Sequence, residues 1–286
     1  MKIVIIGIGL IGGSFARDLQ RAYPEAALLG MDQDPGHLDQ ALSLGLVRGV
    51  ATPGDLREAD MVLVCIPVGS LARELPGILS QVGEETLVFD AGSTKSLICQ
   101  AVAGHPARRN FLACHPIAGT EFTGPQAAVE GLFNGKTNII CEVELTAFRI
   151  QERALEVFQK LGMRIRYMNP EAHDRHIAYV SHLSHISSFM LGKTVIEKER
   201  NERDIFDLAG SGFESTVRLA KSSPAMWTPI FEQNRENVME TLDEYIANLQ
   251  GFRTLLEQGD FQGVFEAMEQ TNRIKDILRG IPTPKN

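Results

Sequence analysis

Two polar residues, Ser93 and His115, follow apolar strand-like runs. Ser93 lies within Asp90–Lys95 and His115 within Cys114–Glu121. Parallel sheets bind ligands at the carboxyl ends of their strands, so both residues are expected at one ligand edge. An imidazole that titrates near neutral pH can take a proton from a substrate hydroxyl while hydride leaves the same carbon. We predict that His115 is this base and that Ser93 orients it or shares the hydroxyl. A lone histidine on a loop is, however, more often a hydrogen-bonded structural residue.

A glycine-rich turn opens the chain. The apolar run Lys2–Ile6 leads into a turn made of Gly7, Ile8, Gly9, Leu10, Ile11 and Gly12, after which a helical pattern begins. Between a strand and a helix, this G-x-G-x-x-G spacing is typical of a dinucleotide site. Gly7 permits the turn, Gly9 lets a pyrophosphate approach the backbone, and Gly12 lets the helix pack closely. The helix N-terminus then offers free amides to the phosphates. The alternative is a turn that serves packing alone.

Asp32 ends the second strand-like run, about the expected distance after the glycines. A carboxylate at this place accepts hydrogen bonds from the adenine-ribose hydroxyls and repels a 2′-phosphate. No arginine is adjacent, because Gln33 and Asp34 follow. We therefore predict that the cofactor is NAD. The alternative is an ordinary aspartate in a surface turn.

A polar stripe marks the second half of the chain. At 100° per residue, one side of a helix carries Asp174, Ser181, His182 and His185. Three interpretations are open, namely a solvated face, a metal site, and a contact to an anion or substrate. A hydride-accepting cofactor removes the need for a Lewis acid, so we expect no metal.

Arg218 follows the glycine-rich break Gly210–Gly212. Its planar guanidinium is suited to hold a carboxylate through two parallel hydrogen bonds. The alternative for this residue is an arginine on a helix surface.

Apolar runs that alternate with helical patterns supply the elements that position these residues. The strand-like runs are Lys2–Ile6, Ala27–Met31, Met61–Ile66, Thr86–Phe89, Phe111–Cys114, Thr137–Glu142 and Met163–Met168. The helical patterns between them include Leu10–Arg21, Ser70–Leu79 and Ala147–Leu161. Short, nearly all-apolar strands that alternate with helices are typical of a parallel sheet covered on both faces. We predict an α/β fold with a doubly wound, Rossmann-type sheet in residues 1–168.

The sequence changes character after Asn169 and Pro170. Pro170 suits the first turn of a helix, and no convincing strand follows it. Helical patterns run over Glu171–Lys198, Asp204–Lys221, Pro224–Glu257 and Phe261–Arg279. We place a domain boundary near Met168 and predict an all-α domain over residues 169–286.

One of these predicted helices carries a long apolar stripe. Near one face of the segment Phe231–Leu256 lie Phe231, Val238, Leu242, Tyr245, Ile246, Leu249 and Phe252. A stripe of this length usually packs against several helices or a second subunit. We therefore expect a homodimer formed by the helical half.

Composition limits the partners and the compartment. The 286 residues carry a net charge of −8, which argues against nucleic acid or an anionic membrane as the main partner. We find no signal peptide and no apolar run long enough for a membrane helix. The cysteines lack metal-ligand spacing and are expected as reduced filler, Cys114 beside His115 included. We expect a cytoplasmic protein that binds a small molecule.

Four strings in this order resemble the prephenate and arogenate dehydrogenase family. They are GxGLIGGS, DxGSxK, HPxAGTE and HDxxxAxxSHLxH, and the resemblance covers essentially the whole chain. The resemblance implies an NAD-binding domain followed by a helical domain that forms a dimer. It further implies that His115 bonds the substrate's ring hydroxyl with help from Ser93. The implied substrate-binding residues are Glu121, His182, His185, Arg218 and Trp227.

The chain departs from this family pattern at two places. Ser184 stands where the family often has proline. The family commonly has the string GFxDxTR around the arginine, and in Gly212–Arg218 its aspartate and threonine positions hold Ser215 and Val217. The second departure leaves open how Arg218 is held.

The resemblance implies oxidation of prephenate by NAD with loss of carbon dioxide, giving 4-hydroxyphenylpyruvate. The nearest rival is arogenate dehydrogenase, whose substrate carries an amino group on its arm. A β-hydroxyacid dehydrogenase shares the two-domain plan but typically has a lysine where this chain has histidines. A non-catalytic NAD-binding regulator would have no reason to keep Ser93, His115 and the histidine stripe together. Since the chain ends soon after the helical half, any feedback by tyrosine is expected at the active site itself.

Overall fold

The computed structural model describes residues 1–200, 202 and 204–279. The chain divides into two compact units, with the break between Asn234 and Arg235. The first unit holds the sheet and the helices that follow it as far as residue 234, and the second holds only helices.

An eight-stranded sheet forms the centre of the first unit, with the order β3-β2-β1-β4-β5-β6-β7-β8. The strands are β1 (Lys2–Ile6), β2 (Ala27–Met31), β3 (Gly49–Val50), β4 (Met61–Val64), β5 (Leu87–Asp90), β6 (Phe111–Pro116), β7 (Thr137–Cys141) and β8 (Arg164–Tyr167). Neighbours from β3 to β6 pair in parallel, and the strand order reverses at β1. Open α/β sheets bind ligands at such a switch point. The α/β, Rossmann-type fold predicted from the sequence is confirmed.

The last part of the sheet departs from the predicted parallel arrangement at one pair of strands. Strand β7 pairs antiparallel with β6, Ala113 lying opposite Cys141, and β8 then pairs in parallel with β7. The predicted parallel pairing therefore holds for the other neighbouring strands but not between β6 and β7. A parallel return needs a crossover, usually an α-helix, whereas the connection from β6 to β7 holds only the 3-10 turn Pro125–Ala127.

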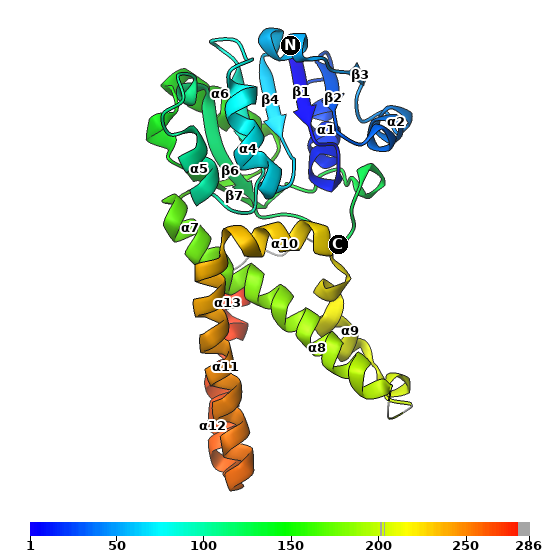
Figure 1. The fold of residues 1–286 in the computed structure, drawn as a ribbon, viewed down its shortest axis with the longest axis vertical. Coiled ribbons are helices and arrows are strands. Elements are labelled where there is room, and N and C mark those ends of the chain that lie inside the picture. Colours follow the sequence, from blue (N-terminus) through cyan, green and yellow to red (C-terminus); the bar gives the residue numbers. More distant parts are fainter. Residues whose placement is uncertain (201, 203, 280–286) are drawn as a thin grey trace. The chain divides into compact units, whose positions relative to one another are not determined.

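Helices cover both faces of the sheet (Figure 1). They are α1 (Leu10–Ala22), α2 (Pro35–Ser43), α3 (Pro53–Glu58), α4 (Val68–Leu79), α5 (Ser96–Val102) and α6 (Phe148–Lys160). Alternate residues of β1 belong to different cores, since Ile3 and Ile5 pack with α1 and α6 while Val4 packs with α3, α4 and α5. This period of two matches the near-continuous apolar runs of the sequence, because both faces are buried.

Helices alone follow Pro170 in the described residues. In the first unit these are α7 (Pro170–Ile177), α8 (Leu183–Glu199), α9 (Ser211–Val217) and α10 (Pro224–Gln233). A π-helical turn, Ala178–His182, joins α7 to α8, and a 3-10 turn, Arg218–Lys221, follows α9. The π turn widens the helix, so the even 100° spacing assumed for Asp174 and His182 does not hold through it.

The predicted helix Pro224–Glu257 is wrong as a single element. Helix α10 ends at Gln233, because the backbone of the next residue, Asn234, leaves the helical region at φ −107° and ψ 26°. Helix α11 (Arg235–Gln258) belongs to the second unit. Phe231 therefore does not share a helix with Phe252, and the predicted apolar stripe is interrupted. Instead α10 packs on α4, where the Gln233 side-chain amide donates to the Val68 carbonyl over 2.6 Å.

The second unit contains α11, α12 (Phe261–Thr271) and α13 (Ile274–Arg279). Gly259 turns the chain between α11 and α12 with a left-handed φ of 67°, and the Asp260 side chain caps α12 by accepting from the Gly263 amide. None of the helices in the described parts of the chain combines the length and apolarity that a membrane span needs.

Candidate active site

The glycine turn has the shape of a phosphate cradle. Gly7 adopts φ 87°, and a Cβ on it would lie 2.6 Å from the Cys65 carbonyl oxygen. A Cβ on Gly12 would lie 2.0 Å from the Gly7 carbonyl oxygen, so α1 packs on β1 only with glycine there. A Cβ on Gly9 would meet no atom within 4 Å, and no side chain caps the N-terminus of α1. Open space beside uncapped amides fits the pyrophosphate of a dinucleotide.

Asp32 follows β2 and lies directly beside this turn. Its carboxylate accepts hydrogen bonds from the Ile8 amide over 2.8 Å and from the Asp34 amide over 3.0 Å. His37, at the start of α2, brings Nδ1 to 3.5 Å from the same carboxylate, a contact that sequence reasoning missed. The arrangement holds the Asp32 carboxylate at the switch-point edge, where a ribose acceptor is needed.

His115 is a buried residue of β6 itself, one position before the strand ends, and not a loop residue after the strand. Its Nδ1 lies 2.8 Å from Nε2 of His173 on α7. Burial lowers the pKa of His115 well below its usual value, and the neighbouring His173, Lys95 and His182 lower this pKa further. The imidazole is therefore neutral at neutral pH, the state that a general base requires.

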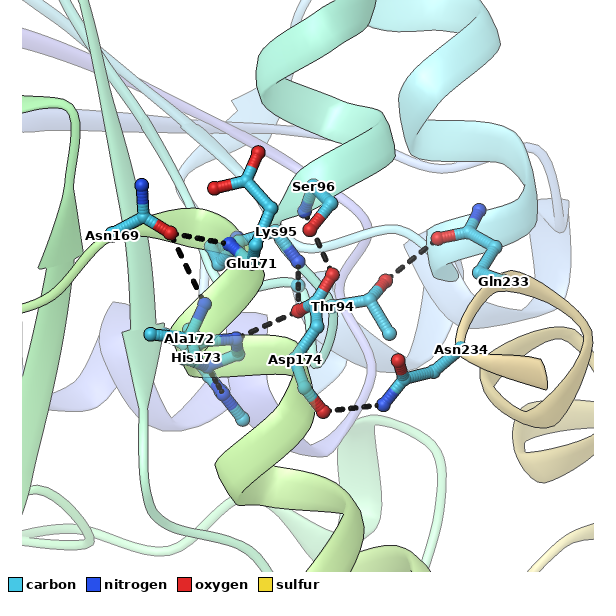
Figure 2. Close-up of polar contacts among 12 residues, drawn as sticks. Thr94, Lys95, Ser96, Asn169, Glu171, Ala172, His173, Asp174, Gln233 and Asn234 are labelled. Atoms are coloured by element: carbon cyan, nitrogen blue, oxygen red, sulfur yellow. Dashed lines mark hydrogen bonds and ion pairs between the residues drawn. The ribbon is translucent and has the colours of Figure 1, made fainter. Parts of the chain in front are cut away.

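His173 and its neighbour Asp174 extend this contact. His173 Nδ1 lies 2.8 Å from Asp174 Oδ1, and both side chains are buried. Figure 2 shows the Asp174 carboxylate at the N-terminus of α5, where it accepts from the backbone amides of Lys95 (2.7 Å) and Ser96 (2.8 Å). Burial alone would raise the pKa of Asp174, but the hydrogen bonds from His173, Ser96 and Lys95 together lower it. Asp174 is thus an ionised helix cap.

Sequence reasoning missed His173 and misplaced Asp174. Asp174 was grouped with His182 and His185, yet its carboxylate faces α5 and His173. In the part of the chain that the structure describes, no three His, Cys, Asp or Glu side chains gather as a metal site. The signal available was the adjacent His-Asp pair of the HDxxxAxxSHLxH string, which periodicity alone does not connect to β6.

Lys95 fixes the two loops at the ligand edge. Its ammonium is fully buried, forms an ion pair with Asp90, and donates to the Cys114 carbonyl over 2.7 Å. Asp90 in turn accepts from the amides of Cys114 and Gly92. A buried charge needs such a partner, and this pair joins the end of β5 to β6 beside His115. Lys95 is the last residue of the DxGSxK string but was not predicted as a site residue.

Ser93 lies on the loop that Lys95 anchors. Its side chain is partly buried and makes no hydrogen bond to another described residue. The structure therefore places Ser93 at the ligand edge but does not join it to His115.

An aromatic cluster gathers three of the predicted substrate residues. His185 stacks on Trp227 with ring centroids 3.5 Å apart, and His182 meets Trp227 edge-on at 5.8 Å. His185 Nδ1 donates to the Ser181 carbonyl. Burial lowers the pKa of His182 to about 4. His182 Nε2 and Trp227 Nε1 are both buried without a protein partner in the described residues. Buried polar atoms left unpaired in this way are suited to meet a ligand or water.

The two remaining predicted residues bind each other. Arg218, in the 3-10 turn after α9, places Nη1 3.1 Å from Glu121 Oε2. The Arg218 side chain is 50% exposed and that of Glu121 is 17% exposed. A hydrogen bond from its own backbone and the nearby Arg218 lower the pKa of Glu121. Glu121 therefore holds Arg218 in this structure.

The dinucleotide turn at the switch point, the neutral histidine buried on β6 and the helices that reach it define a two-part, nucleotide-dependent dehydrogenase. Family models specify this class. The model for the prephenate dehydrogenase nucleotide-binding domain matches residues 15–167, more than half of the chain, and that for the prephenate dehydrogenase dimerization domain matches residues 169–270. The chain therefore belongs to the prephenate dehydrogenase family.

Named relatives agree with this assignment. A prephenate dehydrogenase of Bacillus subtilis is 29% identical across 98% of this chain and 76% of its own length. A cyclohexadienyl dehydrogenase of Zymomonas mobilis is 28% identical across 97% of this chain and 96% of its own. The crystal structure of an Aquifex aeolicus prephenate dehydrogenase with hydroxyphenyl propionate and NAD⁺ superposes with a TM-score of 0.85. It is 29% identical and covers 97% of this chain and 98% of its own.

Three predictions from the sequence are confirmed by this membership. The resemblance was to the correct family, the chain is an NAD-dependent oxidoreductase, and NAD is its cofactor. Its helical half contains the dimerization domain of the family.

Proposed function

We propose that the protein oxidises prephenate with NAD, giving 4-hydroxyphenylpyruvate, carbon dioxide and NADH. The observation that carries this proposal is His115, a neutral and buried imidazole on β6 at the same sheet edge as the glycine turn. The relatives named prephenate dehydrogenase support the choice of substrate.

The proposed reaction assigns one proton transfer to His115. The turn from Gly7 to Gly12 and the Asp32 carboxylate would hold NAD, whose nicotinamide would accept the hydride when bound. His115 takes the proton of the ring hydroxyl while hydride leaves the carbon that bears it. The bond to the ring carboxylate then breaks, carbon dioxide leaves, and its electron pair completes an aromatic ring. Ser93 lies beside this hydroxyl in the proposal. Aromatisation makes the reaction effectively irreversible.

Arg218 is proposed to bind a substrate carboxylate in exchange for Glu121. The Glu121 pair is partly exposed, and such surface pairs contribute about 0–1 kcal/mol. A bidentate, charge-assisted bond to a carboxylate contributes roughly 1.5–3 kcal/mol. The substrate is therefore able to displace Glu121. His182, His185 and Trp227 would line the remaining wall, where two buried polar atoms have no protein partner.

The assembly and the setting belong to the same proposal. Residues 1–168 would form the NAD-binding domain, and residues 169–286 the substrate-binding domain that joins two copies. The net charge of −8 favours neither nucleic acid nor an anionic membrane as a partner. All four cysteines are free thiols, which suits a reducing cytoplasm.

A direct assay tests the substrate. Purified protein is mixed with NAD and either prephenate or arogenate, and NADH is followed by absorbance, with NADP as a parallel cofactor. We expect turnover with prephenate and a clear preference for NAD. Turnover with arogenate alone would move the assignment to the amino substrate, which a 27%-identical arogenate dehydrogenase of Synechocystis with a TM-score of 0.77 makes the second candidate. No turnover with either would contradict the proposal.

A further inference from the structure

We propose that His173 and Asp174 are positioning residues that hold His115 in the one tautomer able to act as a base. The inference rests on the proposed role of His115. Its basis is the buried chain of contacts from His115 Nδ1 to His173 Nε2 and from His173 Nδ1 to Asp174 Oδ1, each 2.8 Å long.

The Asp174 carboxylate sets the positions of the hydrogens on the two histidines. Both oxygens of its carboxylate accept backbone amides, Oδ1 that of Lys95 over 2.7 Å and Oδ2 that of Ser96 over 2.8 Å (Figure 2). Amides can only donate, so the carboxylate is held as an ionised acceptor. His173 Nδ1 lies 2.8 Å from Oδ1 and must therefore carry a hydrogen.

The state of His173 then decides that of His115. Burial lowers the pKa of His173, so this imidazole is neutral at neutral pH and carries one hydrogen. With that hydrogen on Nδ1, the Nε2 atom of His173 is an acceptor. His115 Nδ1 lies 2.8 Å from it and must donate. The single hydrogen of neutral His115 is thereby fixed on Nδ1, and Nε2 keeps its lone pair for the substrate.

This order of hydrogens matters because the opposite tautomer cannot act. With its hydrogen on Nε2, His115 would present a donor to the ring hydroxyl and could not take the proton. The contacts through His173 to Asp174 also stabilise the positive charge that forms when His115 is protonated. The fully buried Lys95 ammonium opposes that charge, as does His182. Asp174 lies two hydrogen bonds away as the compensating carboxylate, the role that an aspartate has behind the histidine of a serine protease.

The hydrogen-bonded set His115, His173 and Asp174, called the relay below, also joins two parts of the sequence. His115 lies on β6, within the range of the nucleotide-binding family model, whereas His173 and Asp174 lie on α7, within that of the dimerization model. Asn169 caps the N-terminus of α7, and Asn234 at the end of α10 donates to the Asp174 carbonyl over 2.6 Å. Helix α7 is therefore held by Asn169 and by Asn234 in the position where His173 contacts His115.

Nitrogen NMR tests the tautomer without substrate. Protein labelled with ¹⁵N-histidine is measured with NAD at neutral pH, and the His115 signals are identified by their loss in His115→Asn. We expect His115 with its hydrogen on Nδ1. In Asp174→Asn, an NH₂ in the place of Oδ1 would donate to His173 while the amide oxygen, in the place of Oδ2, still accepts from the Ser96 amide, so the hydrogen should move to Nε2 of His115. Wild-type His115 with its hydrogen on Nε2 would overturn the inference even if the substrate assignment failed.

Kinetics give a second test with a matched control. His173→Phe removes the acceptor, and we expect kcat to fall by about ten- to hundredfold, less than the loss of the base itself, with a changed pH profile. His173→Gln keeps a carbonyl acceptor for His115 and should recover most of kcat. Asn169→Ala weakens the cap of α7 without touching the relay, so its pH profile should match wild type. Wild-type kcat and pH profile in His173→Phe, or equal losses in His173→Phe and His173→Gln, would contradict the positioning role.

Discussion

At the scale of single residues, the state of His115 decides whether the site can work. Replacing it by asparagine keeps a similar size but removes the base, and such a loss lowers turnover by on the order of 10²–10⁴. We expect His115→Asn to lose turnover to this extent while the Kd for NAD changes little, because the imidazole acts on the substrate. Steady-state kinetics and NAD titration measure both quantities. A variant that keeps most of its turnover would remove His115 from the mechanism.

Arg218 differs from His115 because it acts on binding. The Arg218→Ala variant should raise KM for prephenate about tenfold to a hundredfold, corresponding to the roughly 1.5–3 kcal/mol of a charge-assisted carboxylate contact, and should change kcat less. Arg218→Lys should recover only part of the affinity for prephenate, because an ammonium cannot form the two parallel hydrogen bonds of the planar guanidinium. An unchanged KM in Arg218→Ala would leave Arg218 as a surface partner of Glu121 alone.

The chemistry of individual residues was more predictable than their contacts. His115, Asp32 and the glycines could be predicted because each is read from a strand and the residues that follow it. His173 could not, because its contact with His115 spans 58 positions and arises only when α7 reaches β6. The Glu121–Arg218 pair, 97 positions apart, was invisible for the same reason. Helical periodicity predicts which residues share one face of a helix, but it does not predict which strand that helix packs against.

At the scale of elements, two glycines of the glycine turn are expected to have different roles, Gly9 in binding NAD and Gly12 in the packing of α1 on β1. The Gly9→Ala variant adds a Cβ where no atom lies within 4 Å, so its thermal stability should stay near wild type. Its Kd for NAD should rise, since the methyl group occupies the approach of the pyrophosphate. Gly12→Ala is the matched contrast, because its Cβ would lie 2.0 Å from the Gly7 carbonyl and must displace α1 from β1. We expect Gly12→Ala to lower Tm by several degrees, measured by thermal unfolding. Equal Tm values for the two variants would contradict this assignment.

Other elements show where sequence patterns stop being informative. Seven of the eight strands were predicted, and those at the centre of the sheet are nearly all apolar because both of their faces are buried. The missed strand, β3, has two residues and cannot show a pattern. The direction of β7 depends on a connection without an α-helix, and the break at Asn234 falls inside a pattern that stays apolar on both sides. Tertiary packing, rather than local preference, decided these two features.

At the scale of the whole molecule, buried neutral histidines should make stability depend on pH. The pKa of His182 is lowered by burial to about 4, below its unfolded value of about 6.5. Between these pH values the unfolded chain therefore binds a proton at His182 more readily than the folded chain. As a result, the free energy of unfolding decreases as the pH falls from about 6.5 toward 4. His182 alone should contribute a slope of about 1.4 kcal/mol per pH unit there. Urea unfolding at pH 7 and pH 5 should show a smaller decline in His182→Gln than in wild type. An identical decline in both would contradict the prediction.

The second compact unit carries the prediction about assembly. Helices α11 to α13 expose many large apolar side chains, among them Leu249, Leu256, Phe261, Phe265, Met268 and Ile277. So many exposed apolar groups on few helices usually mark an interface, and the family model that matches residues 169–270 is a dimerization domain. We expect a homodimer by light scattering at micromolar concentration. Leu249→Asp should shift the equilibrium toward monomer, whereas Gln250→Asp, an exposed neighbour that adds the same charge, should not. A monomeric wild type would contradict the prediction, and equal effects of the two substitutions would show that charge, rather than the apolar contact of Leu249, controls the association.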